Sequence, residues 1–335
     1  MATIGNTVPT MADLAKRMDP NGSIAAVAEL LAQSNEILDD IPWIEGNLPV
    51  GHRTTLRTSL PTVYWRRFNQ GVLPSKSTTS QVDETVGMME AYAEVDKELI
   101  KLYGNQGAAF RASEDNSFVE AMNIEFASKL FYGSLATTPE AFTGLATRIS
   151  DVNFGESSSG AKDGAVVEGG GSGSDNTSIW LVVWGPNTIH GIYPKGTEGG
   201  LQSEDLGQNT KVDSTGAMYE VLRSHFMWKC GIALRDWRYI VRIANIDWSN
   251  LVANSSAANL ITLMIKAIDR IPNLNAGRPV FYAPRGVFTM LRIQALAASQ
   301  YTTTFEEVAG RKVMAFQGIP IRKVDQILTT EAQLT

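Results

Sequence analysis

The sequence contains little of what many enzymes and secreted proteins depend on. Its 335 residues include 1 cysteine and 3 histidines. A single cysteine cannot form an internal disulfide, so the chain does not require an oxidising compartment. No apolar run reaches the roughly 18–20 residues of a membrane span, and the first residues lack the basic-then-apolar order of a signal peptide. We therefore expect a soluble protein that is made in the cytosol and does not enter a membrane.

The charge balance also limits the function. The formal net charge is -6, with 44% hydrophobic and 19% charged residues. This composition is typical of a globular protein, and its acidic balance argues against a protein whose main role is to bind nucleic acid. At roughly 100–200 residues per domain, the length predicts about two structural units.

Recognisable catalytic motifs are missing. His52, His190 and His225 lie far apart, and none has a second His or Cys at zinc-ligand spacing. Cys230 follows Trp228 closely, and a lone cysteine in such a position is usually buried. The sequence has neither a G-x-S-x-G elbow nor a G-x-x-x-x-G-K-[ST] phosphate loop. We predict no catalytic residue, no metal site and no cofactor, and hence no enzyme.

One segment has no acidic residue. Residues 46–82 contain five bases and no acid, and six acids follow within residues 83–98. Segments 52–59 and 80–90 have strand-like patterns, so we expect a long hairpin with its tip within 68–79. Such a hairpin is only marginally stable alone. Its charges favour contact between copies of the chain, although any single residue could equally belong to an ordinary solvated surface. The candidates for this contact are Arg53, Arg57, Arg66, Arg67, Lys76, Asp83 and Glu84.

Hydrophobic periodicity predicts the remaining elements. Apolar residues recur at helical spacing from about 106 to 132, which predicts a long structural helix. We also expect helices at 21–40 and at 138–149, the latter capped by Thr138. Residues 151–176 read as a flexible glycine-rich loop. Alternation in 237–243 predicts a half-buried strand. A helix-strand-helix unit within 255–299 is followed by strands, so the fold class is α+β.

Three segments carry a resemblance to a known family. They are "GVLPSKSTTSQVDETVGMMEAYAEVDKEL", "GIALRDWRYIVRIANID" and "GIPIRKVDQI". With the order of arm, hairpin, long helix and terminal strands, the sequence resembles the major capsid proteins of tailed bacteriophages. These have the Hong Kong 97-type fold, and the resemblance is to the epsilon-fifteen-like podoviruses in particular. It covers essentially the whole chain.

The resemblance implies a division of the chain into regions. The Hong Kong 97-type fold has an N-terminal arm, an extended hairpin loop, a peripheral domain with a long spine helix, and an axial domain. The implied regions are 1–49 (arm), 50–91 (extended loop), 92–152 (peripheral domain with spine helix), 153–213 (glycine-rich insertion), 214–250 (peripheral-domain strands), 251–304 (axial domain) and 305–335 (C-terminal peripheral-domain strands).

The resemblance also implies a function. The protein would self-assemble into hexamers and pentamers of an icosahedral viral head, or virion shell, around double-stranded DNA. Assembly would take place in the host bacterial cytoplasm. The implied partners are cement or decoration proteins, scaffolding proteins, a portal at one vertex, and DNA held non-specifically on the inner face. The founding member cross-links Lys to Asn, but no matching Asn and Glu align with Lys76, so we expect noncovalent contacts.

Other functions remain as alternatives. The first is another structural virion protein without enzymatic activity, such as a tail or cement component. The chain has no repeats and a dominant central helix, which is unlike a fibre. A scaffolding or DNA-binding protein should be more helical, more charged or more basic. An enzyme with an unfamiliar site would need a cluster of ionisable residues, and the sequence offers no candidate.

Overall fold

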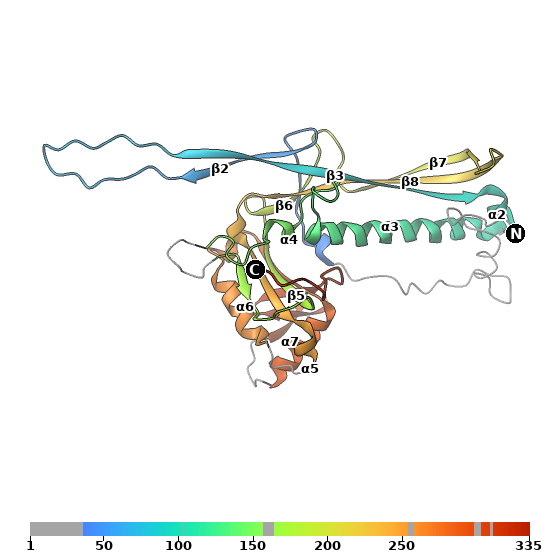
Figure 1. The fold of residues 1–335 in the computed structure, drawn as a ribbon. Coiled ribbons are helices and arrows are strands. Elements are labelled where there is room, and N and C mark those ends of the chain that lie inside the picture. Colours follow the sequence, from blue (N-terminus) through green and yellow to red (C-terminus); the bar gives the residue numbers. More distant parts are fainter. Residues whose placement is uncertain (1–35, 103, 157–163, 254–257, 298–302, 309–310) are drawn as a thin grey trace. The chain divides into compact units, whose positions relative to one another are not determined.

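The computed structural model describes residues 36–102, 104–156, 164–253, 258–297, 303–308 and 311–335 (Figure 1). These residues form two compact units. The larger unit comprises 36–87, 129–199 and 230–335, and the smaller unit takes its described residues from 88–128 and 200–229. The chain therefore leaves each unit and returns to it. Three of the boundaries between the units fall inside long elements, namely strand β3 (Thr78–Asp96), helix α3 (Gly107–Tyr132) and strand β8 (Met218–Leu234).

The larger unit is built on a mixed β-sheet. Its order is β11-β12-β13-β10-β5-β6, with β9 also beside β5, β4 beside β9, and β1 beside β6. Residues 231–234 of β8 pair with β6, and residues 78–85 of β3 pair with β2. The strands are β1 (Trp43–Glu45), β2 (Gly51–Ser59), β4 (Val166–Glu168), β5 (Asn176–Trp184), β6 (Ile189–Tyr193), β9 (Ile240–Asp247), β10 (Arg278–Ala283), β11 (Thr303–Val308), β12 (Arg311–Phe316) and β13 (Ile319–Lys323).

Strand β5 lies at the centre of this sheet. It pairs antiparallel with both β9 and β10, and all nine of its residues are buried. Residues 153–213 were expected to be an insertion, and this does not hold for β5 and β6. The apolar and β-branched sequence of β5 suits this place. The strand has a neighbour along each edge, and both of its faces are covered.

Strand β9 corrects a second expectation. The alternation in 237–243 predicts a strand with one exposed face, but 237–239 form the 3-10 helix η3 and β9 is buried at seven of its eight residues. Arg242 interrupts the apolar pattern, yet it is buried as well. Its guanidinium donates to Ser178 Oγ, the Ile149 carbonyl and Glu331 Oε2 at 2.9–3.1 Å. A polar residue that finds such partners can occupy the interior.

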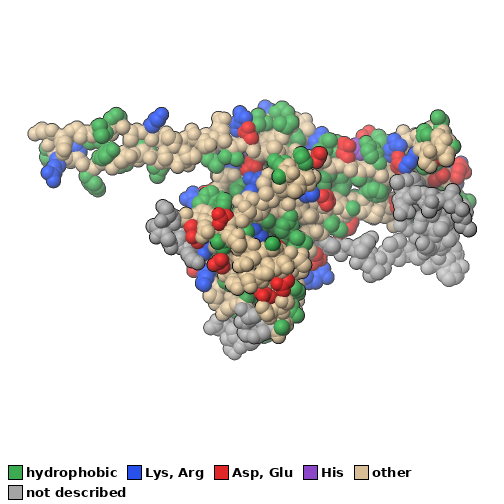
Figure 2. Space-filling model, in the orientation of Figure 1, with side chains coloured by type: hydrophobic (Ala, Val, Ile, Leu, Met, Phe, Trp, Pro, Cys, Tyr) green, Lys and Arg blue, Asp and Glu red, His purple; other side chains and the backbone are tan. Residues whose placement is uncertain are grey.

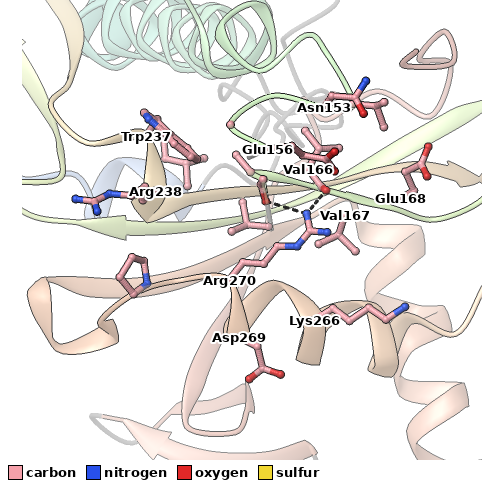
Figure 3. A pocket seen from close by; sticks show the side chains of 17 residues that line it. Asn153, Glu156, Val166, Val167, Glu168, Trp237, Arg238, Lys266, Asp269 and Arg270 are labelled. Atoms are coloured by element: carbon pink, nitrogen blue, oxygen red, sulfur yellow. Dashed lines mark hydrogen bonds between the residues drawn. The ribbon is translucent and has the colours of Figure 1, made fainter. Parts of the chain in front are cut away.

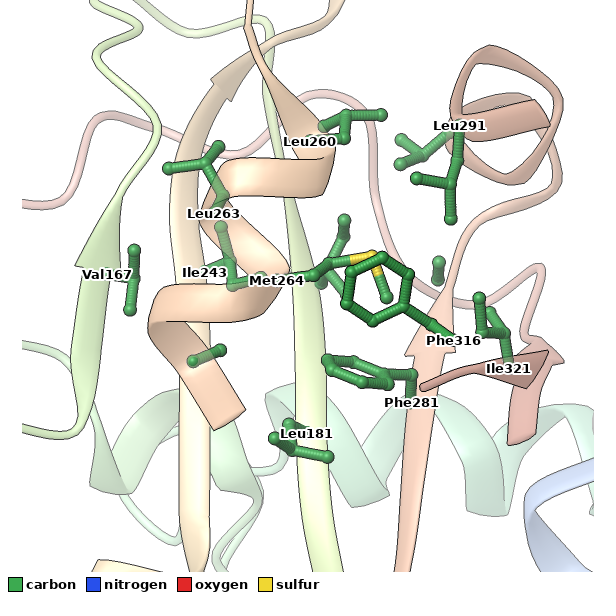
Figure 4. Close-up of a cluster of buried hydrophobic side chains, with 14 of the residues drawn as sticks. Val167, Leu181, Ile243, Leu260, Leu263, Met264, Phe281, Leu291, Phe316 and Ile321 are labelled. Atoms are coloured by element: carbon green, nitrogen blue, oxygen red, sulfur yellow. The ribbon is translucent and has the colours of Figure 1, made fainter. Parts of the chain in front are cut away.

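Helices α6 (Leu260–Asp269) and α7 (Arg285–Ala297) contribute to the main hydrophobic core. Leu260, Leu263 and Met264 of α6 and Leu291 of α7 pack with Phe281 of β10 and with side chains of β5, β9, β12 and β13 (Figure 4). The Asn259 side chain accepts a hydrogen bond from the Thr262 amide and so caps α6. The predicted helix-strand-helix order is confirmed by α6, β10 and α7.

The smaller unit joins the first 22 residues of α3 to a hairpin. Strand β7 (Leu201–Val212) pairs antiparallel with residues 218–228 of β8. Phe126 of α3 stacks on Trp228 with ring centres 4.6 Å apart, and Phe118 stacks on Phe226 at 6.2 Å. Helix α2 (Lys97–Leu102) and the 3-10 helix η2 (Gly104–Gln106) precede α3. The long predicted helix is confirmed almost to the residue.

Two other predicted helices differ from the structure. Within 138–149 only α4 (Leu145–Arg148) is helical, because the Gly144 amide donates to the Gly133 carbonyl at 2.9 Å and holds the preceding residues in turns. Of the helix predicted at 21–40, residues 21–35 lie outside the described part, and 36–39 form the 3-10 helix η1. The other short helices are α5 (Trp248–Ala253) and η4 (Leu274–Ala276).

The glycine-rich segment is more ordered than its composition suggests. The Gly169 amide donates to the Ala244 carbonyl at 2.8 Å, and the Gly171 amide donates to the Asn245 carbonyl at 2.7 Å. A Cβ atom on Gly171 would lie 2.7 Å from that carbonyl oxygen. Residues 169–171 therefore follow β4 along the edge of β9, where glycine permits the close backbone approach. Residues 157–163 lie outside the described part.

Candidate subunit interface

The predicted hairpin is present, and its two strands differ in length. Strands β2 and β3 pair antiparallel from Gly51 opposite Thr85 to Ser59 opposite Thr78. Residues 60–77 connect them without helix or strand, and Figure 1 shows this connection as an extended loop. A turn closes it, with the Gln70 amide donating to the Arg67 carbonyl at 3.3 Å. Ser75 Oγ donates to the Thr62 carbonyl at 2.8 Å and joins the two sides of the loop.

The outer part of this hairpin is exposed throughout. We call residues 57–76 the loop tip, and every one of them is exposed. Trp65 is 105% exposed and Phe68 96%. Figure 2 shows hydrophobic and basic side chains projecting from the loop, which contains no acid. Its other large exposed apolar side chains are Leu60, Val63, Tyr64, Val72 and Leu73. A contiguous set of exposed apolar side chains is typical of a protein-binding surface.

The base of the hairpin is fixed by a buried ion pair. Arg148 of α4 donates from both terminal nitrogens to the carboxylate of Glu84, at 2.6 and 2.5 Å. Glu84 is 6% exposed, and the Leu234 amide lies 3.5 Å from the same carboxylate. A Cβ atom on Gly51 would lie 2.1 Å from the Glu84 carbonyl oxygen, so glycine allows β2 to approach β3 at this point. The direction in which the hairpin leaves the unit is therefore set by packing at its base.

A second ion pair lies further along the hairpin. Arg53 of β2 faces Asp83 of β3 and donates to both carboxylate oxygens, at 2.6 and 2.7 Å. The hydrogen bond from Arg53 holds the pKa of Asp83 below its usual value, and Asp83 raises the pKa of Arg53 in return. Both side chains are about half exposed, so we expect water and salt to screen the attraction.

The structure therefore separates the seven predicted contact residues into three groups. Arg57, Arg66, Arg67 and Lys76 are exposed on the loop tip, and Arg53 is paired with Asp83. Glu84 is buried and its charge is satisfied by Arg148, so its role as a contact between subunits is not supported. Trp65 and Phe68 were not among the predicted contact residues. The sequence does contain a sign of them, because two large aromatic residues stand in a segment that lacks the alternation of a half-buried strand.

A hollow lies in the larger unit. Its volume is about 730 Å³, and it is lined by residues of β4, β9 and α6, by the segments before β4 and β9, and by the segment after α6 (Figure 3). Trp237 forms part of its wall, and Arg270 donates to the carbonyls of Gly164 and Val166 across it. Arg270 is thus engaged with backbone. The other charged side chains around the hollow have mixed signs, namely Glu156, Glu168, Arg238, Lys266 and Asp269.

Three features of the described residues bear on other functions. These residues contain no group of three or more His, Cys, Asp or Glu side chains placed to hold a metal ion. None of their helices combines the length and hydrophobicity of a membrane span. Cys230 is buried, and burial raises the pKa of its thiol far above the usual value. Such a thiol is a poor nucleophile.

Comparison with known proteins identifies the family. A family model described as major capsid protein GP7 matches residues 19–335. The chain belongs to this family. As a GP7-type major capsid protein, it is a structural protein whose function is to form a capsid shell. The match covers both units and the exposed hairpin. The alternative of a tail or cement component finds no support in it.

Solved structures agree with this assignment. A chain in the near-atomic cryo-EM structure of bacteriophage Epsilon15 is 36% identical to this capsid protein, with a TM-score of 0.78 and 100% coverage of both chains. The capsid of bacteriophage JBD30 matches 90% of this chain and 95% of its own at a TM-score of 0.50 and 10% identity, which supports the fold alone. The Hong Kong 97-type α+β fold expected from the resemblance is confirmed. No curated protein matches significantly.

Proposed function

We propose that this capsid protein assembles into hexamers and pentamers of an icosahedral head around phage double-stranded DNA, in the cytoplasm of the host bacterium. The proposal rests on the family match and on the similarity to a chain of the bacteriophage Epsilon15 structure over its full length. In this role the protein acts through its surfaces and has no catalytic step.

The observation that carries the proposal is the exposure of the loop tip. In the single chain, the side chains of Trp65 and Phe68 are almost completely exposed to water. Burying a large apolar side chain contributes roughly 1.5–3 kcal/mol, so covering this set of side chains with another copy would strongly favour assembly. Obligate interfaces are large and more apolar than transient ones. The loop tip supplies such area without a core of its own.

The basic side chains of the loop tip fit the same role. Arg57, Arg66, Arg67 and Lys76 carry four positive charges with no acid among them. The chain as a whole has a net charge of -6, so another copy offers an acidic surface overall. We propose that these charges set the register of the loop tip on its neighbour, because interfacial charges favour specificity more than affinity. Arg53 and Asp83 would flank this contact.

We assign the regions of the chain according to the family resemblance. Residues 1–49 are proposed as the N-terminal arm and 50–91 as the extended loop. The peripheral domain would take 92–152, 214–250 and 305–335, and the axial domain 251–304 would surround the centre of each hexamer or pentamer. Within 153–213, β5 and β6 belong to the core, so we restrict the proposed insertion to the parts outside these strands.

The further partners are part of this proposal. A shell filled with DNA needs a portal at one vertex, and its inner face would contact DNA without reading sequence. Scaffolding proteins would guide assembly, and cement or decoration proteins would reinforce the finished shell. We expect these contacts to be noncovalent, including those of Lys76.

Electron microscopy of the purified full-length chain tests the proposal. We expect shells, tubes or rings. The double variant Trp65→Ser and Phe68→Ser should keep the circular dichroism spectrum of the wild type and form none of them. A matched control replaces Val212 and Met218, which are exposed apolar residues of the β7–β8 hairpin, and should assemble. A chain that remains a monomer at every concentration would contradict the proposal.

A further inference from the structure

Two of the three histidines meet at the base of the exposed hairpin. His52 is the second residue of β2, and His190 lies on β6. Their ring centres are 5.7 Å apart, and the rings cross at 84°. His190 is 1% exposed, and neither of its ring nitrogens makes a hydrogen bond of normal geometry with the residues that the structure describes. We call His52 and His190 the histidine pair.

The groups around the histidine pair disfavour an added proton. Arg235, which follows β8, acts on both rings and lowers the pKa of each. Glu84 of β3 is the acid near His52, but both of its carboxylate oxygens already bind Arg148. A protonated ring would therefore meet a positive charge and an acid that is already paired.

The pKa directions agree with this geometry. Burial lowers the pKa of His190 to about 4, with His52 and Arg235 acting in the same direction and the Gly185 carbonyl opposing them. Burial and Arg235 also lower the pKa of His52, against Glu84. Neutral histidines are thus compatible with the packed base of the hairpin, whereas charged ones are not.

We propose that the histidine pair is a pH-sensitive hinge, in which protonation separates β2 from β6 and frees the hairpin to change its direction. The packed state binds fewer protons than the open state, so it loses stability as the pH falls below the ordinary histidine pKa of about 6.5. This loss levels off near pH 4, where His190 is protonated in the packed state too. The Arg148–Glu84 ion pair continues to hold β3, so the hairpin pivots about this pair and is not released from the unit.

This hinge is a property of the single chain. Its consequence for shells, namely that acid would alter the reach of the loop tip to a neighbouring copy, rests on the proposed function. The hinge itself does not. It can therefore be measured whether or not the sample assembles.

Hydrogen exchange with mass spectrometry tests the hinge on the full-length chain. Exchange in peptides covering β2 and β6 is compared at about pH 7 and about pH 5 after division by the intrinsic rate at each pH, and we expect protection to fall on the order of tenfold. His190→Leu should remove this response, since leucine fills the space and the histidine has no normal hydrogen bond to lose. His52→Gln, at a less buried position, should weaken it.

His225 provides a matched control. It lies on β8, stacked on Tyr92 and with Nε2 3.7 Å from a carboxylate oxygen of Glu90. His225→Gln should leave the response of β2 and β6 unchanged. Wild-type protection that does not change with pH, or a full response in His190→Leu, would overturn the hinge. If His190→Leu does not fold, the exchange of the His52→Gln variant tests the hinge. A loss of protection in this variant as large as in the wild type would also overturn it. Electron microscopy of the same samples reports assembly separately.

Discussion

Strand β5 and the loop tip belong to the same compact unit, and both carry aromatic side chains. Trp180 and Trp184 of β5 are almost completely buried, whereas Trp65 and Phe68 of the loop tip are almost completely exposed. The difference lies in their neighbours. β5 has β9 and β10 along its two edges, whereas residues 60–76 of the loop tip belong to no strand. The same residue types thus stabilise the single chain in one place and leave a surface for another molecule in the other.

The first test removes an aromatic side chain from β5. Trp180 packs against the ring of Phe131, and the Arg242 guanidinium lies 5.1 Å from its ring centre. Trp180→Ala should lower the free energy of unfolding by about 3–5 kcal/mol, because it leaves a cavity in a closely packed core. Urea unfolding followed by circular dichroism measures this. The control Trp65→Ala should change the unassembled chain by no more than about 0.5 kcal/mol. Equal losses in the two variants would contradict the comparison.

The second test concerns the base of the hairpin, where exposed and buried regions meet. Arg148→Met leaves the Glu84 carboxylate buried without its partner, and we expect a loss of about 3 kcal/mol. The double variant with Glu84→Leu should recover more than half of it, because no buried charge remains. Thermal and urea unfolding of the two variants provide the measurement. A stable Arg148→Met protein would show that water compensates Glu84.

The third test moves outward to the Arg53–Asp83 pair. Since both side chains are about half exposed, Arg53→Ala should lower the free energy of unfolding much less than Arg148→Met, because water already screens the charges of an exposed pair. The difference from the wild type should shrink when unfolding is repeated at about 0.5 M instead of about 0.05 M salt, because salt screens exposed charges. A larger loss that salt leaves unchanged would mean that this pair behaves like the buried one at the base.

The fourth test has the smallest expected effect on folding. Reversing the charge of both Arg66 and Arg67 to Glu should change the free energy of unfolding by less than about 0.5 kcal/mol, as for other exposed residues. Assembly should be impaired strongly, as counted by electron microscopy. The matched control, with both residues changed to Lys, keeps the charge and should assemble. Normal shells from the charge-reversed chain would remove the loop tip from the proposed interface.

Much of the fold follows from local patterns. The strands of the hairpin, the helix at 107–132 and the helix-strand-helix order near the C-terminus each have a periodicity that the structure repeats. The errors share one cause. Arg242 made 237–243 resemble a strand with one polar face, and glycines made 153–213 resemble an insertion. Burial of Arg242 depends on Glu331, 89 residues away, and the order of Gly169–Gly171 depends on backbone groups of β9. Local periodicity contains no information about such partners.

For the candidate interface too, the sequence predicts one part and the structure decides the rest. The acid-free segment is visible in the sequence, and so are the basic residues of the loop tip. The sequence does not separate Glu84 from Asp83, which are adjacent and chemically alike. Alternation along β3 places Asp83 outward beside Arg53 and Glu84 inward against Arg148. One residue of register therefore decides which carboxylate can serve an interface and which fixes the hairpin.

The sequence by itself determined the α+β class, the long helix, the acid-free hairpin and the resemblance to phage capsid proteins, because composition and periodicity are properties of neighbouring residues. Only the tertiary structure decided that β5 is the centre of the sheet, that Glu84 is buried, and that His52 meets His190. Those facts depend on which segments, distant in the sequence, pack together and exclude water. The energetic effect of a charge or a ring depends on the groups that this packing places around it.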